Sequence, residues 1–93
     1  MLETVTLHVF YPLADLVKGK KTIRMEWEGG TLAELIDELA TRYGRAIKEE
    51  LLGDNGGLNG GYVMVVDGHR AKDLQARLRN AADITVLTPI PGG

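Results

Sequence analysis

The sequence contains no cysteine, which excludes disulfide bonds, thiolate metal sites and a catalytic thiol. It has no excess of positive charge, since 11 Lys and Arg residues against 13 Asp and Glu give a formal net charge of -2. No stretch approaches the ~20 consecutive apolar residues of a membrane span. We therefore expect a cytoplasmic protein that is stabilised by packing and binds neither nucleic acid nor membranes.

What the sequence does contain fits one small domain. The 93 residues, 44% of them hydrophobic, suffice for a single core that buries roughly 60–65% of the surface of the unfolded chain. Pro89 and Pro91 prevent a strand ladder from continuing to the end of the chain. We predict a folded domain over residues 1–88 and a flexible C-terminal tail over residues 89–93 that ends in Gly-Gly.

Alternating polar and apolar residues predict two strands near the N-terminus. The period of two runs through Thr4–Phe10 and again through Thr22–Glu28, as expected for half-buried strands. The segment between them, Tyr11–Lys21, contains a proline, a glycine and three lysines. We interpret it as a loop.

A helix is predicted directly after the second strand. Thr31 and Glu34 have the spacing of a capping box, in which each side chain satisfies a free backbone donor at a helix start. Gly44 is placed to end this helix, and Arg45–Leu52 could add a short second one. The apolar stripe of the main helix has helical spacing and comprises Leu32, Leu35, Ile36, Leu39 and Tyr43.

The second half of the chain begins with a glycine-rich segment. Gly53–Gly61 is too rich in glycine to hold regular structure by itself, and it predicts a mobile surface loop. The apolar run Tyr62–Val66 predicts a buried, central strand that enters a tight turn at Asp67–Gly68, with room for a short strand after it. A last strand is expected at Ile84–Leu87. This order favours an α+β fold of the β-grasp (ubiquitin-like) type, with a mixed sheet of four to five strands packed on one main helix.

Three segments resemble one family. Val63–Gly68 (VMVVDG) is similar to a strand ending in an Asn-Gly turn, Ala82–Val86 (ADITV) to an Asp-Glu-Val strand entry, and Thr88–Gly93 (TPIPGG) to a Pro-Pro-Val-x-Gly-Gly terminus. These are features of the ubiquitin-like (β-grasp) sulfur carriers, and the chain most resembles the small subunit of molybdopterin synthase (MoaD-like), with the ThiS-like thiazole-synthesis carrier a shorter relative. Asp67 and Thr88 depart from the family pattern.

The resemblance implies a function for the chain end. The carboxylate of Gly93 would be adenylated by an ATP-dependent, E1-like partner and converted to a thiocarboxylate with sulfur from a persulfide donor. The large subunit of molybdopterin synthase would then receive the sulfur, in molybdenum or tungsten cofactor biosynthesis. The chain would be a non-catalytic sulfur-donor subunit that binds no cofactor, with ATP used by the partner. Three alternatives stay open: a carrier for thiamine or tRNA thiolation, a protein modifier joined to lysines through Gly93, and an interaction module with an inert tail.

The composition of the tail suits such chemistry. Gly92 and Gly93 have no side chain to collide with a narrow channel. Pro89 and Pro91 restrict the backbone and lower the entropy lost on docking. Extended, residues 89–93 reach at most about 17 Å. A Gly-Gly end alone would equally fit a frayed terminus, and the β-grasp pattern upstream favours the functional interpretation.

Partner contacts are predicted beside this tail. On the last strand, Ile84 and Val86 should face the core and Leu87 the opposite side, where it would form an apolar patch with Ile90. The family resemblance implies that this side of the sheet contacts both partner enzymes. We therefore predict Leu87, Pro89, Ile90 and Pro91 as contact residues, against the alternative of an incidental exposed leucine.

Other polar residues have simpler explanations. His8 and His69 have no neighbouring ligands at metal spacing, so neither a metal site nor a catalytic histidine is predicted. Glu49, Glu50 and Asp54 are expected on a solvated face, because their spacing lacks the alternating ligands of a calcium loop. The glycines before Tyr62 precede a strand instead of opening a helix, which argues against a phosphate-binding loop.

Overall fold

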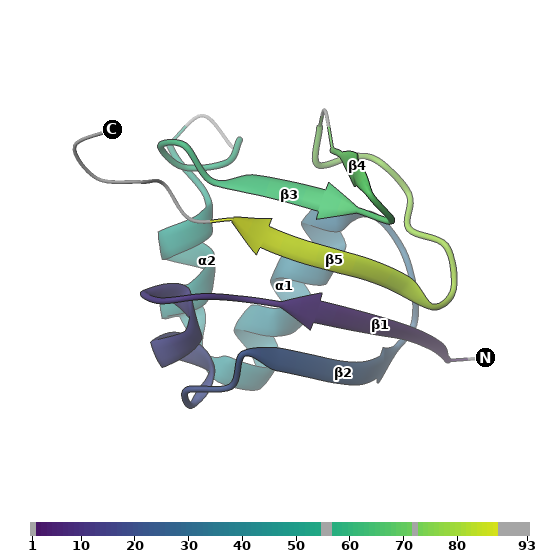
Figure 1. Cartoon of the computed structure of the whole chain (residues 1–93), viewed down its shortest axis with the longest axis horizontal. Coiled ribbons are helices and arrows are strands. Elements are labelled where there is room, and N and C mark those ends of the chain that lie inside the picture. Colours follow the sequence, from purple (N-terminus) through teal and green to yellow (C-terminus); the bar gives the residue numbers. More distant parts are fainter. Residues whose placement is uncertain (1, 55–56, 72, 88–93) are drawn as a thin grey trace.

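A five-stranded mixed sheet forms one layer of the fold (Figure 1). The computed structural model describes residues 2–54, 57–71 and 73–87. Its strands follow the spatial order β2-β1-β5-β3-β4, with β1 and β5 parallel and the other pairs antiparallel. They are β1 (Glu3–His8), β2 (Thr22–Trp27), β3 (Val63–Val66), β4 (His69–Arg70) and β5 (Ala82–Leu87). The predicted β-grasp fold and the short strand after the turn are confirmed.

The helices form the second layer and cover one face of the sheet (Figure 1). The main helix α1 spans Leu32–Tyr43, and a shorter helix α2 spans Arg45–Leu51. The predicted capping box is present, because the backbone N–H of Glu34 donates to Thr31 Oγ1 (3.2 Å) and the N–H of Thr31 donates to Glu34 Oε1 (2.9 Å). Within the part of the chain that the structure describes, no helix is long and apolar enough to cross a membrane.

The core lies between the two layers. Alternate side chains of β1, β2 and β5 point toward the helices, while the apolar stripe of α1 points toward the sheet. Among the described residues, no helix lies over the opposite face of the sheet (Figure 1). The largest fully buried side chains include Leu7, Leu32, Leu35, Ile36, Leu39, Ile47, Leu51, Met64 and Ile84. The sheet therefore has one packed face and one open face.

The connection from β4 to β5 crosses the start of α1. The backbone N–H of Leu32 donates to the carbonyl of Ala76 (3.1 Å), and that of Ala33 donates to the carbonyl of Leu74 (2.9 Å). The first donors of a helix have no partner within the helix, so this connection satisfies two of them. In return, the N–H of Leu78 donates to the carbonyl of Gly30 (2.8 Å).

Two predictions about the elements are wrong. Part of the predicted loop Tyr11–Lys21 is a 3₁₀ helix, η1 (Leu13–Val17), whose residues Leu13 and Val17 are fully buried. Its five residues are too few to produce a recognisable helical period in the sequence. The run Tyr62–Val66 is not the central strand, because β5 occupies the centre and β3 lies next to the edge strand β4.

The glycine-rich segment is more ordered in its described part than we predicted. Leu52 and Leu58 form an isolated bridge, and Leu58 packs partly buried against the core. The backbone N–H of Asn59 donates to the carbonyl of Leu51 (2.7 Å). Tyr62, at the end of the segment, donates its hydroxyl to Glu50 Oε2 (2.6 Å). Hydrogen bonds to α2 thus stabilise a segment whose glycines alone would leave it flexible. Glu50, which we expected on a solvated face, accepts a hydrogen bond from Tyr62.

Candidate functional site

The central strand β5 leads directly to the predicted tail. Its last residue, Leu87, is 43% exposed and points to the open face, while Val86 before it is buried. The predicted orientation of Leu87 is therefore confirmed, and its role in partner binding stays a prediction. The other predicted site residues, Pro89, Ile90, Pro91, Gly92 and Gly93, lie outside the described residues, as does the predicted domain boundary.

Three further apolar residues lie at the level of Leu87 or close to it. Val63 of β3 is directly opposite Leu87 in the register. On the other side, β1 runs parallel to β5 and its last residue, His8, is opposite Thr85. Phe10 follows two residues after His8, as Leu87 follows two residues after Thr85, and so belongs to the same end of the sheet. Phe10 is 45% exposed and Tyr11, next to it, is 75% exposed.

We refer to Phe10, Tyr11, Val63 and Leu87 as the end patch. Phe10, Tyr11 and Leu87 are exposed and Val63 is half-buried. Exposed apolar side chains that gather at one place are typical of protein-binding surfaces. Our sequence analysis found only Leu87 and missed the other three. The alternation along each strand was a sign of their outward direction, but only the strand register brings Phe10 and Val63 alongside Leu87.

Outside the end patch, and apart from the half-buried Val65, which is opposite Thr85, the open face carries polar side chains along β1 and β5. His8 Nε2 lies 2.8 Å from Asp83 Oδ1, which joins neighbouring strands β1 and β5. We expected His8 to be an isolated polar strand residue, and its partner was missed because 75 residues separate the two in sequence. In residues 2–54, 57–71 and 73–87, no three His, Asp or Glu side chains form a group that could hold a metal ion.

The start of β5 is held in place by the turn between β3 and β4. Asp67 Oδ1 accepts a hydrogen bond from the backbone N–H of Asp83 (3.0 Å), and the two Asp67 carboxylate oxygens accept from the guanidinium of Arg79 (2.9 and 3.0 Å). The backbone donor first, and the Arg79 charge in addition, hold the pKa of Asp67 below its usual value against partial desolvation, which raises it. This arrangement fixes the strand that carries the tail.

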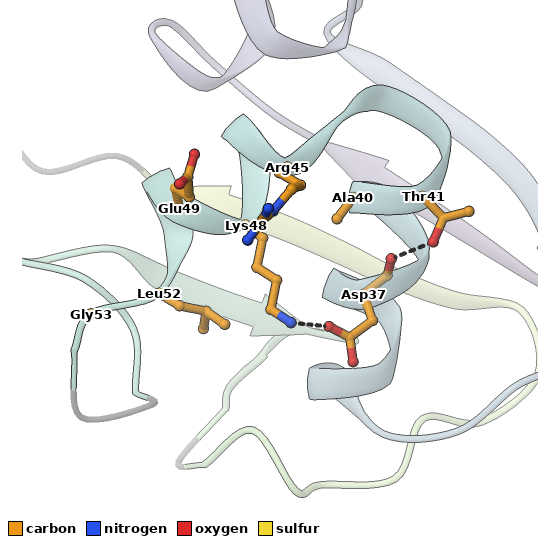
Figure 2. A pocket seen from close by; sticks show the side chains of 8 residues that line it. All are labelled: Asp37, Ala40, Thr41, Arg45, Lys48, Glu49, Leu52 and Gly53. Atoms are coloured by element: carbon orange, nitrogen blue, oxygen red, sulfur yellow. Dashed lines mark hydrogen bonds and ion pairs between the residues drawn. The ribbon is translucent and has the colours of Figure 1, made fainter.

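The helix side of the molecule carries a groove (Figure 2). It has a volume of about 640 Å³ and lies between α1 and α2, above Ala40 and Leu52. Figure 2 shows Lys48 extended toward Asp37, with 2.5 Å between Lys48 Nζ and Asp37 Oδ1. The charged groups on its walls are exposed, and none of the described buried side chains has an unpartnered polar atom. We find no sign of a binding site there.

These features define the class of protein. A mixed sheet in the order β2-β1-β5-β3-β4, one main helix across it, and a chain end that leaves the central strand beside an apolar patch describe a ubiquitin-like protein of the β-grasp fold. A family model confirms and narrows this assignment, because the ThiS family matches residues 7–93. The chain belongs to the ThiS family of β-grasp sulfur carriers.

Solved structures of the same fold cover nearly the whole chain. CysO in its complex with BexX from Amycolatopsis orientalis is 25% identical, with a TM-score of 0.81, and the match covers 96% of this chain and 99% of that one. The Haloferax volcanii small archaeal modifier protein 1 is 21% identical, with a TM-score of 0.78 and coverage of 95% and 99%. A Pyrococcus furiosus protein provisionally named molybdopterin converting factor, subunit 1, is 23% identical, with a TM-score of 0.71 and coverage of 95% and 99%. No curated protein sequence matches the chain significantly.

Proposed function

We propose that the chain carries sulfur as a thiocarboxylate on Gly93 and delivers it in molybdopterin biosynthesis, as the donor subunit of a synthase. The observation that carries this proposal is the family match, which extends through the Gly-Gly end to residue 93. The open sheet face supports this proposal, because the end patch lies at the C-terminal end of β5, the strand that precedes the tail in sequence. A partner enzyme that binds the end patch would position the tail at the entrance of the partner's active site.

The chemistry needs an activating partner because a carboxylate is a poor electrophile. The Gly93 carboxylate attacks the α-phosphate of ATP, releasing pyrophosphate and leaving an acyl-adenylate. Hydrosulfide then attacks the acyl carbon and AMP leaves, which gives the thiocarboxylate. If a persulfide attacks instead, the product is an acyl disulfide, and a thiol must reduce its sulfur–sulfur bond to free the thiocarboxylate. The cysteine-free chain has no thiol of its own to attack the activated carbon.

A second candidate function is conjugation to other proteins. It is favoured by the similarity to the Haloferax volcanii small archaeal modifier protein 1, whose name describes a modifier. Here a lysine amine attacks the activated Gly93 carbon, AMP or a partner thiol leaves, and an isopeptide bond forms. Both functions begin with adenylation of Gly93. They differ in the nucleophile that then attacks the activated carbon, which is sulfur in the first function and a lysine amine in the second.

Intact-mass spectrometry tests both candidates. The chain is incubated with an adenylating enzyme from its own organism, ATP and sulfide. A mass gain equal to one oxygen replaced by one sulfur supports the carrier function, and conjugates of higher mass in lysate support the modifier function. Transfer of that sulfur to a pterin precursor, in the presence of a large synthase subunit, tests the pathway. An unchanged mass under all these conditions would contradict both proposals.

Two extension variants provide matched controls. Two residues added after Gly93 should abolish thiocarboxylate formation on Gly93, because the Gly93 carboxylate then becomes the carbonyl of a peptide bond. The same two residues added before Met1 should leave loading intact, because the N-terminal end of β1 lies at the opposite end of the sheet from the C-terminal end of β5 (Figure 1). Equal loading of the two variants would exclude Gly93 as the reactive group.

A further inference from the structure

The side chains of three lysines close to the end patch take part in no ion pair among the described residues. Lys18, Lys20 and Lys21 lie in the connection between η1 and β2, and all three are exposed. The ion pairs found within the described residues involve His8, Arg42, Lys48 and Arg79, and none of these three lysines. We refer to them as the lysine rim.

The backbone places the lysine rim beside the end patch. The N–H of Val9 donates to the carbonyl of Lys21 (2.8 Å), so Lys21 is paired with the residue that precedes Phe10. The connection that carries the rim lies at the end of the sheet toward which both β1 and β5 run (Figure 1). The nearest acidic side chain in sequence is Asp15, which is exposed on η1. With three lysines against this one carboxylate, residues 11–21 carry a net positive charge on a chain whose net charge is -2.

We propose that the lysine rim binds an acidic surface of the adenylating partner, beside the cleft that receives the tail. This inference rests on the proposed function. Protein interfaces commonly combine an apolar centre with a polar, solvent-accessible rim, which is the relation between the end patch and the lysines. Complementary rim charges act chiefly on the rate of association and orient the two surfaces before they touch. The rim thus guides the end of the sheet that carries the tail toward the partner.

An acidic protein surface fits these observations better than a nucleic acid. Phosphate backbones are bound by extended basic surfaces, commonly with arginine, whereas the rim has three lysines and its neighbours are apolar. Phe10, which follows the Val9 bonded to Lys21, and Leu87 on β5 would gain little from a hydrated phosphate backbone. They would gain from burial against protein side chains.

A charge reversal with a matched control tests the proposal. Lys20→Glu/Lys21→Glu changes the net charge from -2 to about -6, and Arg45→Glu/Lys48→Glu does the same on the helix-side groove of Figure 2. Lys18 is left unchanged because its backbone has a φ of 62°, a left-handed conformation that we do not wish to disturb. Thermal melts establish that each variant is folded. The measurement is the association rate with the adenylating enzyme, at about 0.01 M and about 0.5 M salt.

We expect the rim variant to associate roughly 10-fold or more slowly at low salt, and the control no more than about 2-fold. At high salt the difference should disappear because the charges are screened. Equal slowing of both variants would mean that only net charge matters, and equal rates would mean that the rim does not act. Either result overturns the inference about the lysine rim. The proposed function would still stand if the wild-type chain is adenylated.

Two further results would also overturn the inference. If tRNA binds the wild-type chain but not the rim variant, while both associate equally with the enzyme, the rim is a nucleic-acid surface instead. If the wild-type chain is never adenylated by the enzyme, the proposed function fails and the inference with it.

Discussion

Replacing Asp67 with Asn should weaken the anchor of the tail-bearing strand. Asparagine tolerates the left-handed backbone at this position, where φ is 51°, so the turn itself should survive. The variant keeps a neutral acceptor for the N–H of Asp83 and loses the charge that faces Arg79. A hydrogen bond to a charged group contributes about 1.5–3 kcal/mol. The ion pair contributes at most about 1 kcal/mol, because the Arg79 side chain is 63% exposed.

From these terms we expect Asp67→Asn to lower the free energy of unfolding by about 1–2 kcal/mol at neutral pH. The loss should depend on pH with a definite sign. Because the folded-state pKa of Asp67 is depressed, its carboxylate contributes stability above the unfolded-state pKa of about 3.9. That contribution is lost as the pH falls through the folded-state pKa. The stability difference between wild type and variant should therefore shrink below about pH 4.

Urea unfolding followed by tryptophan fluorescence measures this difference. Trp27 is the only tryptophan and is 4% exposed, so its emission reports loss of the core. Asp54→Asn, at an exposed carboxylate within the glycine-rich segment, is the matched control. The reasoning is refuted if the difference between wild type and Asp67→Asn stays constant from about pH 7 to about pH 3, or if Asp54→Asn has the same effect.

Three other substitutions probe separate parts of the molecule. Leu87→Ser should leave the melting temperature nearly unchanged, since the side chain is 43% exposed, but raise the KM of adenylation; an unchanged KM would remove Leu87 from the interface. Thr31→Ala should lower stability by about 1 kcal/mol in urea unfolding, because Glu34 loses its capping partner, and a loss no larger than that of an exposed helix substitution would contradict the capping role. Tyr62→Phe should lower stability by about 1 kcal/mol through loss of its bond to Glu50.

The Tyr62 variant also has a spectroscopic signature. Desolvation, together with the neighbouring Glu50 carboxylate, raises the pKa of Tyr62 to about 12. A raised folded-state pKa means that the stability from this hydrogen bond is present below about pH 10 and is lost as the pH rises through about 12. Absorbance titration of the wild-type chain should show a phenolate step near pH 12 that Tyr62→Phe lacks. If the step persists in the variant, it belongs to another tyrosine.

Apart from the β-grasp fold, which the order of the elements and the family resemblance indicated, the features that the sequence predicted correctly are local ones. Thr31 and Glu34 are three residues apart, and their reciprocal hydrogen bonds need only the first turn of a helix, so the pattern in the sequence defines the geometry. The outward direction of Leu87 follows equally from the alternation along one strand. Elements of this kind depend on neighbours in the chain.

The features that were missed depend on pairing between distant segments. The apolar run at Val63 suggested a central strand. Its position in the sheet depends on β5, which begins 16 residues after β3 ends and takes the central position instead. The pairing of His8 with Asp83 and the grouping of Phe10 with Leu87 follow from the parallel register of β1 and β5. Such registers are set by the whole core. The tail itself stays a prediction from sequence and family.

The attachment of the tail to a central strand has a mechanical consequence. A channel that draws in the chain end pulls β5 along its own axis, between β1 on one side and β3 on the other. In this shear geometry the pulling force is shared by the hydrogen bonds that join β5 to β1 and to β3. An edge strand pulled away from the sheet at one end would instead lose its hydrogen bonds one at a time. If the chain delivers sulfur as proposed, the folded domain should keep its structure while a receiving enzyme repeatedly binds and releases the chain end.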